Sequence, residues 1–162
     1  MQKETVFTNL IREHQALLYK VTSIYIDNKE DQEDLFQEVV YQLWKYFDSF
    51  RNDAKITTWM YRVAMNTAIT YIKRKKKRPD SVPIADVVIK QAEVKDDVIE
   101  ERLRLLYRHL QSLNTLEKGL IFLLLEGKSY KEISEITGLS ASNVGTKISR
   151  VKKKLKTNMT NH

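Results

Sequence analysis

Two carboxylates and an amide stand at helical spacing in the first third of the chain. On a helix predicted over about residues 32–47, Asp34, Gln37, Glu38 and Tyr41 share one face. The opposite arc is apolar and holds Leu35, Phe36, Val39, Val40, Leu43 and Phe47. Paired carboxylates could form a metal or acid–base site, or could only complement the helix dipole. Because the chain has no Glu-x-x-His motif and only three histidines, we expect no catalytic group, no metal site and no cofactor.

Basic and aromatic residues interleave on a second predicted helix, over about residues 57–77. Bases stack on aromatic rings while Lys and Arg follow the phosphate backbone, so this mixture is typical of a single-stranded nucleic-acid surface. A core stripe, a solvated helix end and a membrane-surface patch are the alternatives, the last two for the basic run 73–78. The candidate residues are Lys55, Trp59, Tyr61, Arg62, Asn66, Lys73 and Arg74.

Residues 115–155 contain several signals that end one helix and begin the next. A helix over 115–126 is predicted to stop at Gly127, and Ser129 with Glu132 forms an S-x-x-E capping box for the next helix. Gly138 can adopt the left-handed conformation of a sharp turn, and Ser140 is placed to cap a third helix. Helix, short glycine turn and helix are the parts of a helix-turn-helix, although a plain helical hairpin has the same pattern.

The helix that follows this turn, over residues 141–155, has one apolar stripe and a polar, basic opposite face. Such a second helix enters the major groove of duplex DNA, and lysines 152–154 near its end are placed for phosphates. The buried stripe is Val144, Ile148, Val151 and Leu155, and the outward residues are Ser142, Asn143, Thr146, Lys147, Ser149, Arg150 and Lys153.

The composition of the 162-residue chain agrees with these helices. Four Gly and two Pro are too few for a multi-stranded sheet, so we expect an all-α fold. A net charge of +7 favours an anionic partner. The absence of Cys excludes disulfides and thiolate sites. Because the chain also lacks a secretory signal and an apolar run of bilayer length, we expect a cytoplasmic protein with no stable membrane insertion.

Prolines and charge blocks predict the domain boundaries. Pro79 follows the basic run directly and should end the helix before it. The next stretch is acidic and contains both prolines. We therefore predict a first domain over 1–78, a linker over 79–98 and a second domain over 99–162. The first domain should open with one helix that ends near residue 28 and carries Val6, Leu10, Leu17, Val21 and Ile24 on its apolar side.

These motifs, in this order, resemble bacterial RNA polymerase sigma factors of the compact extracytoplasmic-function (ECF) group. Residues 31–39 with Leu43 and Trp44 resemble the helix that binds core polymerase. Residues 58–68 resemble the segment that melts and reads the minus-ten element. Residues 129–133, 138–140 and 149–155, with Val144, resemble the helix-turn-helix that reads the minus-thirty-five element.

The resemblance implies two small helical domains, sigma region 2 and sigma region 4, and a set of binding residues. Its implied partners are core RNA polymerase, through the clamp coiled coil of the largest subunit and the flap, and promoter DNA; an anti-sigma factor is left open. Polymerase-core binding is assigned to Asp34, Leu35, Gln37, Glu38 and Tyr41. Minus-ten binding is assigned to Lys55, Trp59, Arg62, Asn66, Lys73 and Arg74, with the loop 50–57 capturing unpaired bases. Minus-thirty-five binding is assigned to Ser142, Asn143, Thr146, Lys147, Arg150 and Lys153.

Three residues depart from the family pattern. Asn114 stands where Pro is common, Ser134 where Ala is usual, and Gly145 lies inside the recognition helix.

Two other functions are weighed against a sigma factor, which is the function we predict. A stand-alone helix-turn-helix regulator would leave the Asp34 face unexplained, and the third function is a helical adaptor or membrane-surface protein.

Overall fold

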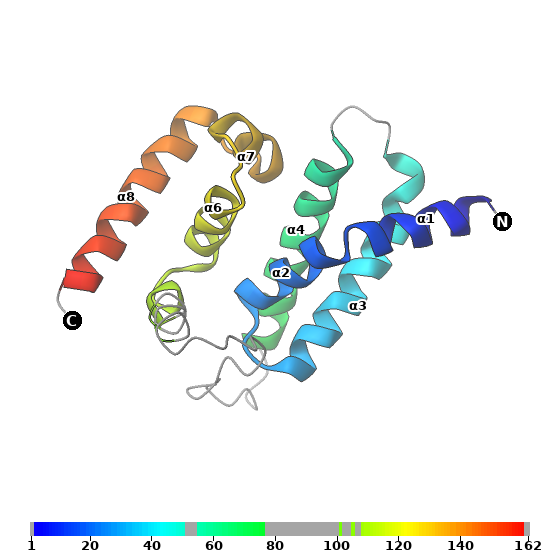
Figure 1. Cartoon of the computed structure of the whole chain (residues 1–162), viewed down its shortest axis with the longest axis horizontal. Helices are drawn as coiled ribbons and strands as arrows, with labels where there is room; N and C mark the ends of the chain where they lie inside the picture. The colour runs from blue at the N-terminus through cyan, green and yellow to red at the C-terminus, as the bar shows by residue number, and fades with distance from the viewer. Residues whose placement is uncertain (1, 51–54, 77–100, 102–104, 106–107, 161–162) are drawn as a thin grey trace. The chain divides into compact units, whose positions relative to one another are not determined.

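A computed structural model describes residues 2–50, 55–76, 101, 105 and 108–160. The predicted linker 79–98 lies outside these residues. Every regular element within them is helical, which confirms the all-α prediction (Figure 1). None of their helices has the length and apolar character needed to cross a membrane. The chain forms two compact units, one built from α1 to α4 and one from most of the chain that follows.

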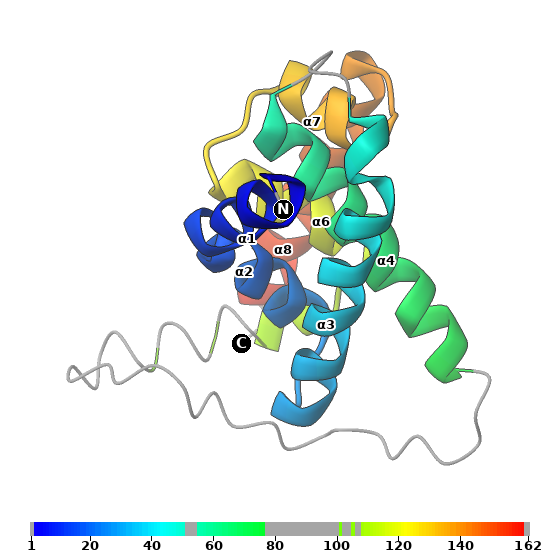
Figure 2. The same ribbon diagram turned by 90° about the vertical axis from the view of Figure 1, so that its right-hand side faces the viewer.

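The first unit is a bundle arranged around one long helix. It contains α1 (Gln2–Glu13), α2 (Gln15–Tyr25), α3 (Lys29–Tyr46), the short 3₁₀ helix η1 (Phe47–Ser49) and α4 (Ile56–Lys76). α4 packs against both α2 and α3, and Figure 2 shows α3 and α4 side by side. Burial of apolar side chains between these helices is the main stabilising contribution. The most buried of them are Leu18, Val21, Leu35, Val39, Leu43, Met60, Ala64 and Ala68.

The opening helix is broken, so the prediction of one continuous helix is wrong. The chain turns at His14, whose φ of −110° and ψ of 18° depart from helical values. Val6 of the predicted apolar stripe is 55% exposed, and Phe7 is buried in its place. The Phe7 ring lies 5.1 Å from that of Trp44, edge to face, and this packing against another helix decides which side of α1 faces inward.

α3 begins three residues before the predicted start, because Asn28 caps it. The Asn28 Oδ1 atom accepts a hydrogen bond from the Asp31 backbone N–H at 2.7 Å. Glu30 and Asp31 then place negative charge in the first turn, where the helix dipole favours it. The predicted apolar arc is confirmed at its centre, where Leu35, Val39 and Leu43 are fully buried.

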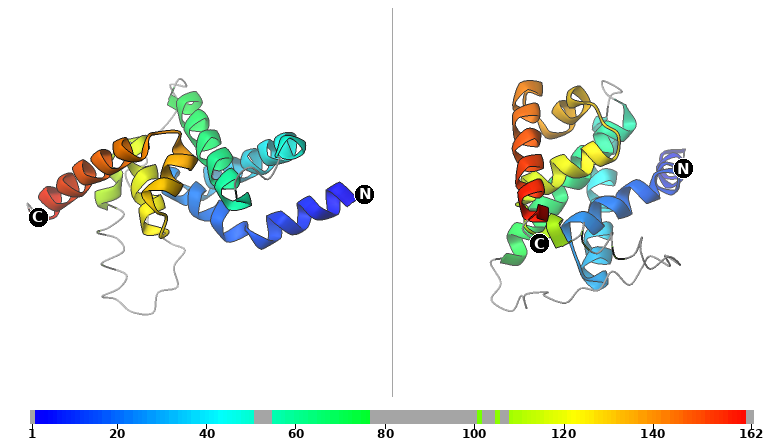
Figure 3. Two further views of the ribbon diagram at one scale, coloured as in Figure 1. Left: turned by 90° about the horizontal axis from the view of Figure 1, so that it is seen from above. Right: turned by 60° about the vertical axis from the view of Figure 1, so that its left-hand side comes forward.

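The second unit has the helix-turn-helix order. Residues 108–111 are helical and are followed by α6 (Thr115–Leu125), α7 (Tyr130–Thr137) and α8 (Ala141–Thr160) (Figure 3). α6 packs against α8. Gly127 and Gly138 have φ values of +81° and +82°, so each supplies the left-handed residue predicted after a helix. The buried side chains include Leu120, Leu123, Ile133, Val144 and Ile148.

Side-chain caps start the helices of the second unit. Ser129 and Glu132 exchange side chain to backbone hydrogen bonds of 3.1 Å each, which confirms the predicted capping box. The Ser140 Oγ atom accepts from the Asn143 N–H at 3.1 Å, as predicted. A second box that we did not predict links Asn114 and Glu117, with two bonds of 2.9 Å at the start of α6.

Candidate functional site

The outer face of α3 carries most of the residues predicted to bind polymerase. Asp34 and Gln37 are exposed, Glu38 is half-buried, and Tyr41 is 58% exposed. The Gln42 Nε2 atom donates to the Glu38 carboxylate at 3.3 Å and holds it in place. Leu35 is fully buried, so its side chain lies in the core beneath this face and not on its surface.

A hollow of about 340 Å³, here called the α3–α4 groove, adjoins this face. α3 contributes Asp34, Gln37 and Glu38 to its lining, and the end of α4 contributes Tyr71, Arg74 and Lys75. The side of the groove formed by α3 is therefore acidic, and the side formed by α4 is basic.

Asp31 joins the start of α3 to the end of α4 and so fixes the two walls of the groove. Its Oδ1 atom accepts from Lys75 Nζ at 2.5 Å and from the Tyr71 hydroxyl at 3.4 Å, and Asn28 Nδ2 donates to its Oδ2 at 2.7 Å. Burial acts to raise the pKa of Asp31, but the bonds from Lys75 and Asn28 outweigh it and lower that pKa below its ordinary value. The hydrogen bond to Asp31 raises the pKa of Lys75. The pair is therefore ionised over a wide pH range.

Tyr71 is a buried residue that also lines the groove. Burial and the neighbouring Asp31 carboxylate raise the pKa of its hydroxyl. The Lys75 ammonium lies 5.4 Å and the Arg74 guanidinium 5.9 Å from the centre of its ring, within the range of cation–π attraction. Neither Asp31 nor Tyr71 was among the predicted site residues, because the contact joins positions forty residues apart and leaves no local pattern in the sequence.

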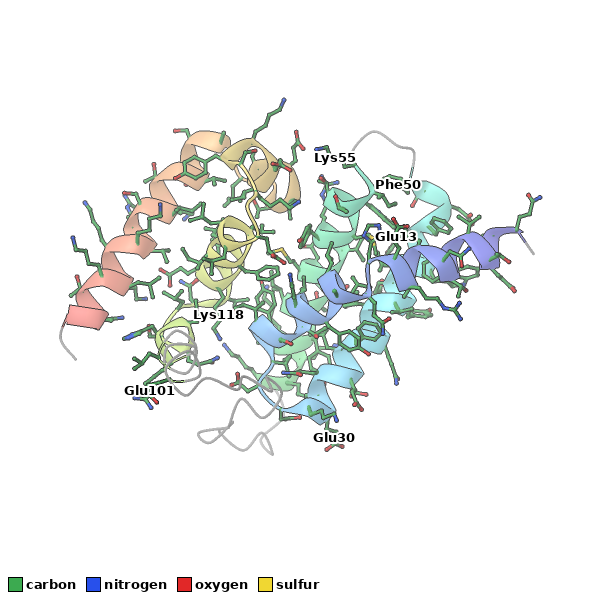
Figure 4. All side chains as sticks on the ribbon, viewed as in Figure 1. Glu13, Glu30, Phe50, Lys55, Glu101 and Lys118 are labelled. Carbon is green, nitrogen blue, oxygen red and sulfur yellow. The ribbon has the colours of Figure 1, made fainter. Side chains whose placement is uncertain are left out.

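The residues predicted for the minus-ten element divide between two sides of α4. Lys55 lies just before the helix, and Arg62, Asn66 and Lys73 follow on one exposed stripe. Figure 4 labels Lys55 and Phe50, the described residues on either side of 51–54. Arg74 leaves this stripe and lines the α3–α4 groove. The structure thus brings four of the six together and separates Arg74 from them.

Trp59, the sixth member of this set, is in the core. Its side chain is only 9% exposed, and its ring lies 5.1 Å from that of Phe50 and 6.4 Å from that of Phe47. Tyr61 is also buried. Trp59 therefore packs against Phe47 and Phe50, as the core interpretation of the sequence has it, whereas the nucleic-acid interpretation placed its ring on the surface. Residues 51–54 of the predicted base-capturing loop lie outside the described residues.

α8 presents the polar face that the sequence predicts. Ser142, Asn143, Thr146, Arg150 and Lys153 are exposed, Lys147 is half-buried, and the opposite stripe of Val144, Ile148 and Val151 is buried. The Thr146 hydroxyl donates to the Ser142 carbonyl at 3.1 Å. Lys154, expected near phosphates, instead forms an ion pair with Glu117 at 3.3 Å.

Each departure from the family pattern has a local structural role. Asn114 caps α6. The Ser134 hydroxyl donates to the Leu139 carbonyl and ties α7 to the turn after it. A Cβ atom on Gly145 would lie 3.3 Å from Cε2 of Tyr130, so glycine admits that ring against α8. Within the described parts of the chain, acidic and histidine side chains form no cluster that could hold a metal ion.

Comparison with known proteins places these surfaces in a family. Residues 10–78 match Sigma-70 region 2, and residues 103–155 match Sigma-70, region 4. The ECF RNA polymerase sigma-E factor of Escherichia coli strain K12 is 27% identical over 161 residues, which cover 92% of this chain and 84% of that protein. The protein of the same description from Haemophilus influenzae is also 27% identical, over 90% of this chain and 83% of its own length. The chain belongs to the ECF sigma factors.

Two solved structures share the fold of this sigma factor. One is the sigma factor RpoE in complex with the anti-sigma factor NepR from Bartonella quintana, with a TM-score of 0.77, 20% identity and coverage of 95% of this chain and 96% of that one. The other is CnrH in complex with the cytosolic domain of CnrY, with a TM-score of 0.70, 21% identity and coverage of 98% and 90%. ECF sigma factors are transcription initiation factors that bind core polymerase and direct it to promoters. The region 2 match decides against the stand-alone helix-turn-helix regulator.

Proposed function

We propose that this sigma factor docks on core RNA polymerase through the outer face of α3 and contacts promoter DNA through the exposed stripe of α4 and the outer face of α8. The observation that carries this assignment is the buried stripe on each helix, which fixes the opposite polar face outward. On α3 that face is mainly acidic, and on α4 and α8 it is basic. The acidic face suits a basic protein surface, whereas the basic faces suit phosphates.

The α4 stripe is proposed to hold the opened minus-ten element. Lys55, Arg62 and Lys73 can follow a strand backbone, and the Asn66 amide can pair with an exposed base edge. Buried residues of α4, Trp59 among them, hold the helix against the core, and a surface that is already in place loses less freedom when it binds an unpaired strand.

The α8 face is proposed to read the minus-thirty-five duplex. Side chains near the start of a recognition helix usually reach base edges, which assigns sequence choice to Ser142, Asn143, Thr146 and Lys147. Arg150 and Lys153, further along, are assigned to the groove and the phosphates, respectively.

We further infer a cytoplasmic location and an anti-sigma partner. ECF sigma factors work with polymerase in the cytoplasm, without catalysing a reaction themselves. The RpoE structure of the same fold contains an anti-sigma factor. A cognate anti-sigma factor should inhibit transcription by this chain when the purified proteins are combined, and unchanged transcription would exclude that protein as its partner.

The central experiment is in-vitro transcription with core polymerase on genomic templates, with start sites mapped with and without this chain. New start sites that require the chain are the expected result, and their absence would contradict the function.

Equilibrium binding to core polymerase tests the α3 face. Asp34→Ala and Glu38→Ala should each weaken binding, by about 2–5 kcal/mol if the charge is desolvated in the complex. Glu13→Ala, an exposed carboxylate on α1, is the control. If both α3 variants bind core polymerase normally, that face is not the interface.

A further inference from the structure

A series of ring contacts, here called the aromatic cluster, links α1 to the beginning of α4. At α1, the Phe7 ring centre lies 5.1 Å from that of Trp44 and 5.3 Å from that of Phe47. At α4, the Trp59 ring centre lies 6.4 Å from that of Phe47 and 5.1 Å from that of Phe50. Paired rings prefer particular relative orientations, so each ring restrains its neighbour. The members are Phe7 of α1, Trp44 of α3, Phe47 of η1, Phe50 directly after η1, and Trp59 of α4.

The cluster restrains the chain where the minus-ten surface begins. The Phe50 N–H donates to the Phe47 carbonyl at 3.2 Å, which ties Phe50 to η1. The Trp59 N–H donates to the Lys55 carbonyl at 3.2 Å, which ties Lys55 to the first turn of α4. The contact between the rings of Phe50 and Trp59 joins these two places. Lys55 is the first residue of the exposed α4 stripe, so the cluster fixes the start of that stripe from the core side.

α1 holds the cluster through a buried ring and an exposed ammonium group. Phe7 is the only buried residue of α1, a helix that the structure describes in full. Lys3 lies one turn earlier on the same side of α1, with its Nζ atom 4.3 Å from the centre of the Trp44 ring and 2.9 Å from Oδ2 of Asp48 in η1. Lys3 and Phe7 lie outside residues 10–78, the part that matches Sigma-70 region 2.

We propose that Phe7 and Lys3 of α1 are positioning residues for the minus-ten surface, which act by holding the aromatic cluster and, through it, Phe50 and the start of the α4 stripe at Lys55. This inference rests on the proposed contact of that stripe with the opened minus-ten element. Neither Phe7 nor Lys3 is assigned a contact with DNA. A surface that is already in place loses less freedom when it binds a single strand, so loosening the cluster should lower strand affinity.

A purely structural role of α1 predicts a different result. In that case Phe7→Ala would lower the free energy of unfolding, but the folded variant would bind a strand as the wild type does. The ion pair of Lys3 with Asp48 separates the two roles. Asp48 is 77% exposed, so the pair contributes little to stability, yet it connects α1 directly to η1. A loss of strand affinity without a loss of stability therefore indicates positioning.

The test uses core polymerase saturated with the full-length chain and a single-stranded oligonucleotide that carries the minus-ten sequence of a mapped promoter. Phe7→Ala should weaken oligonucleotide binding about fivefold, and Lys3→Ala about two- to threefold. Lys3→Arg should bind nearly as the wild type does, because a guanidinium can keep both the ion pair and the contact with the ring. Adding Asp48→Asn to Lys3→Ala should cause little further loss, since both changes remove the same ion pair.

Matched controls come from the same helix. Val6→Ala removes an exposed apolar side chain, and Arg12→Ala removes an exposed cation. Both should leave oligonucleotide binding unchanged. A loss with Arg12→Ala equal to that with Lys3→Ala would mean that the charge of α1 attracts the strand directly, and it would overturn the positioning role of Lys3.

Tryptophan fluorescence reports on the cluster without DNA. The chain has two tryptophans, and both belong to the cluster. Phe7→Ala should shift the emission of the folded protein to longer wavelength, because Trp44 loses a ring packed against it, whereas Val6→Ala should not. Unshifted emission would show that α1 does not hold the cluster and would overturn the inference. Circular dichroism checks that the helices are retained, and Lys3→Ala alone decides the test if Phe7→Ala disturbs α1 as a whole.

Asn66→Ala distinguishes this inference from the function on which it rests. If Asn66→Ala weakens oligonucleotide binding while Phe7→Ala and Lys3→Ala bind as the wild type does, the α4 stripe stands and the role of α1 is wrong. If none of the three variants weakens binding, the proposed minus-ten surface fails and the inference fails with it.

Discussion

At the scale of single residues, the Asp31–Lys75 pair makes the stability of the first unit depend on pH. The folded pKa of Asp31 is lowered, so its contribution is present above the ordinary carboxyl pKa near 3.9 and is lost as the pH falls through the folded value. The folded pKa of Lys75 is raised, so its contribution is present below about 10.4 and is lost as the pH rises through the folded value.

We predict that Asp31→Asn lowers the free energy of unfolding of the first unit at pH 7 by about 0.5–1 kcal/mol, since the pair is partly exposed. The difference from wild type should shrink between about pH 5 and pH 3. Both tryptophans, Trp44 and Trp59, lie in this unit, so tryptophan fluorescence during urea unfolding monitors it selectively. Asp48→Asn is the matched control, because Asp48 pairs with Lys3 but is 77% exposed. A difference that stays constant over this pH range would contradict the assignment.

Tyr25 provides a second residue-scale prediction. Its side chain is buried, its hydroxyl has no hydrogen-bond partner in the described part of the chain, and burial raises its pKa. Tyr25→Phe removes an uncompensated buried polar group and should raise the free energy of unfolding by about 1 kcal/mol, measured by the same fluorescence signal. Tyr19→Phe should be neutral, since Tyr19 is exposed and stacks on Phe36. Destabilisation by Tyr25→Phe would show that the hydroxyl has a partner.

Residues also show how far the sequence could predict the candidate site. The sequence placed Arg62, Asn66 and Lys73 on one helix, and the structure has all three exposed on one side of α4, a relation that helical spacing alone determines. The burial of Trp59 and the orientation of Arg74 toward α3 depend on side chains from other helices. Composition and spacing within one helix carry no information about such neighbours.

At the scale of elements, local signals predicted the helix boundaries where capping is local. Ser129 with Glu132, and Gly127 and Gly138, are short patterns whose geometry is complete within a few residues. The box of Asn114 and Glu117 is of the same kind and could have been predicted, but Asn114 was considered only as a departure from the family pattern. The break at His14 has no Gly or Pro signal, and it accompanies the packing of Phe7 on Trp44.

The two ends of the outer face of α8 should have separable roles. Lys153→Ala should weaken holoenzyme binding to all promoters alike and reduce the slope of its salt dependence by about one, because a neutralised phosphate contributes to affinity and not to sequence choice. Asn143→Ala should change the preferred bases, with a loss of discrimination of about 1–3 kcal/mol at one position. Selection from a promoter library with each variant measures both effects. Wild-type base preference for variants at all of Ser142, Asn143, Thr146, Lys147 and Arg150 would refute the groove assignment.

At the scale of the whole molecule, opposite charges are assigned to different partners. The chain has a net charge of +7, yet the outer face of α3 is acidic. A chain with a uniformly basic surface would bind DNA equally well with and without polymerase. An acidic docking face instead favours binding to a protein before DNA. In the proposed assignment, the α4 stripe and the outer face of α8 each make a modest contact with one promoter element, and their combination gives the affinity.

This division predicts how the chain responds to promoter spacing. Inserting about five base pairs between the two elements rotates one of them by roughly half a helical turn, so α8 and the α4 stripe can no longer engage together. On such a promoter, Asn143→Ala should cause no further loss of open complexes, because α8 has already lost its element. Asn66→Ala should still lower them, because the minus-ten contact remains. Permanganate reactivity of promoter thymines measures both variants on both promoters. On the unmodified promoter the losses should add in the double variant, because the two residues are assigned to different promoter elements. An equal effect of Asn143→Ala on the two promoters would mean that α8 does not act through the minus-thirty-five element.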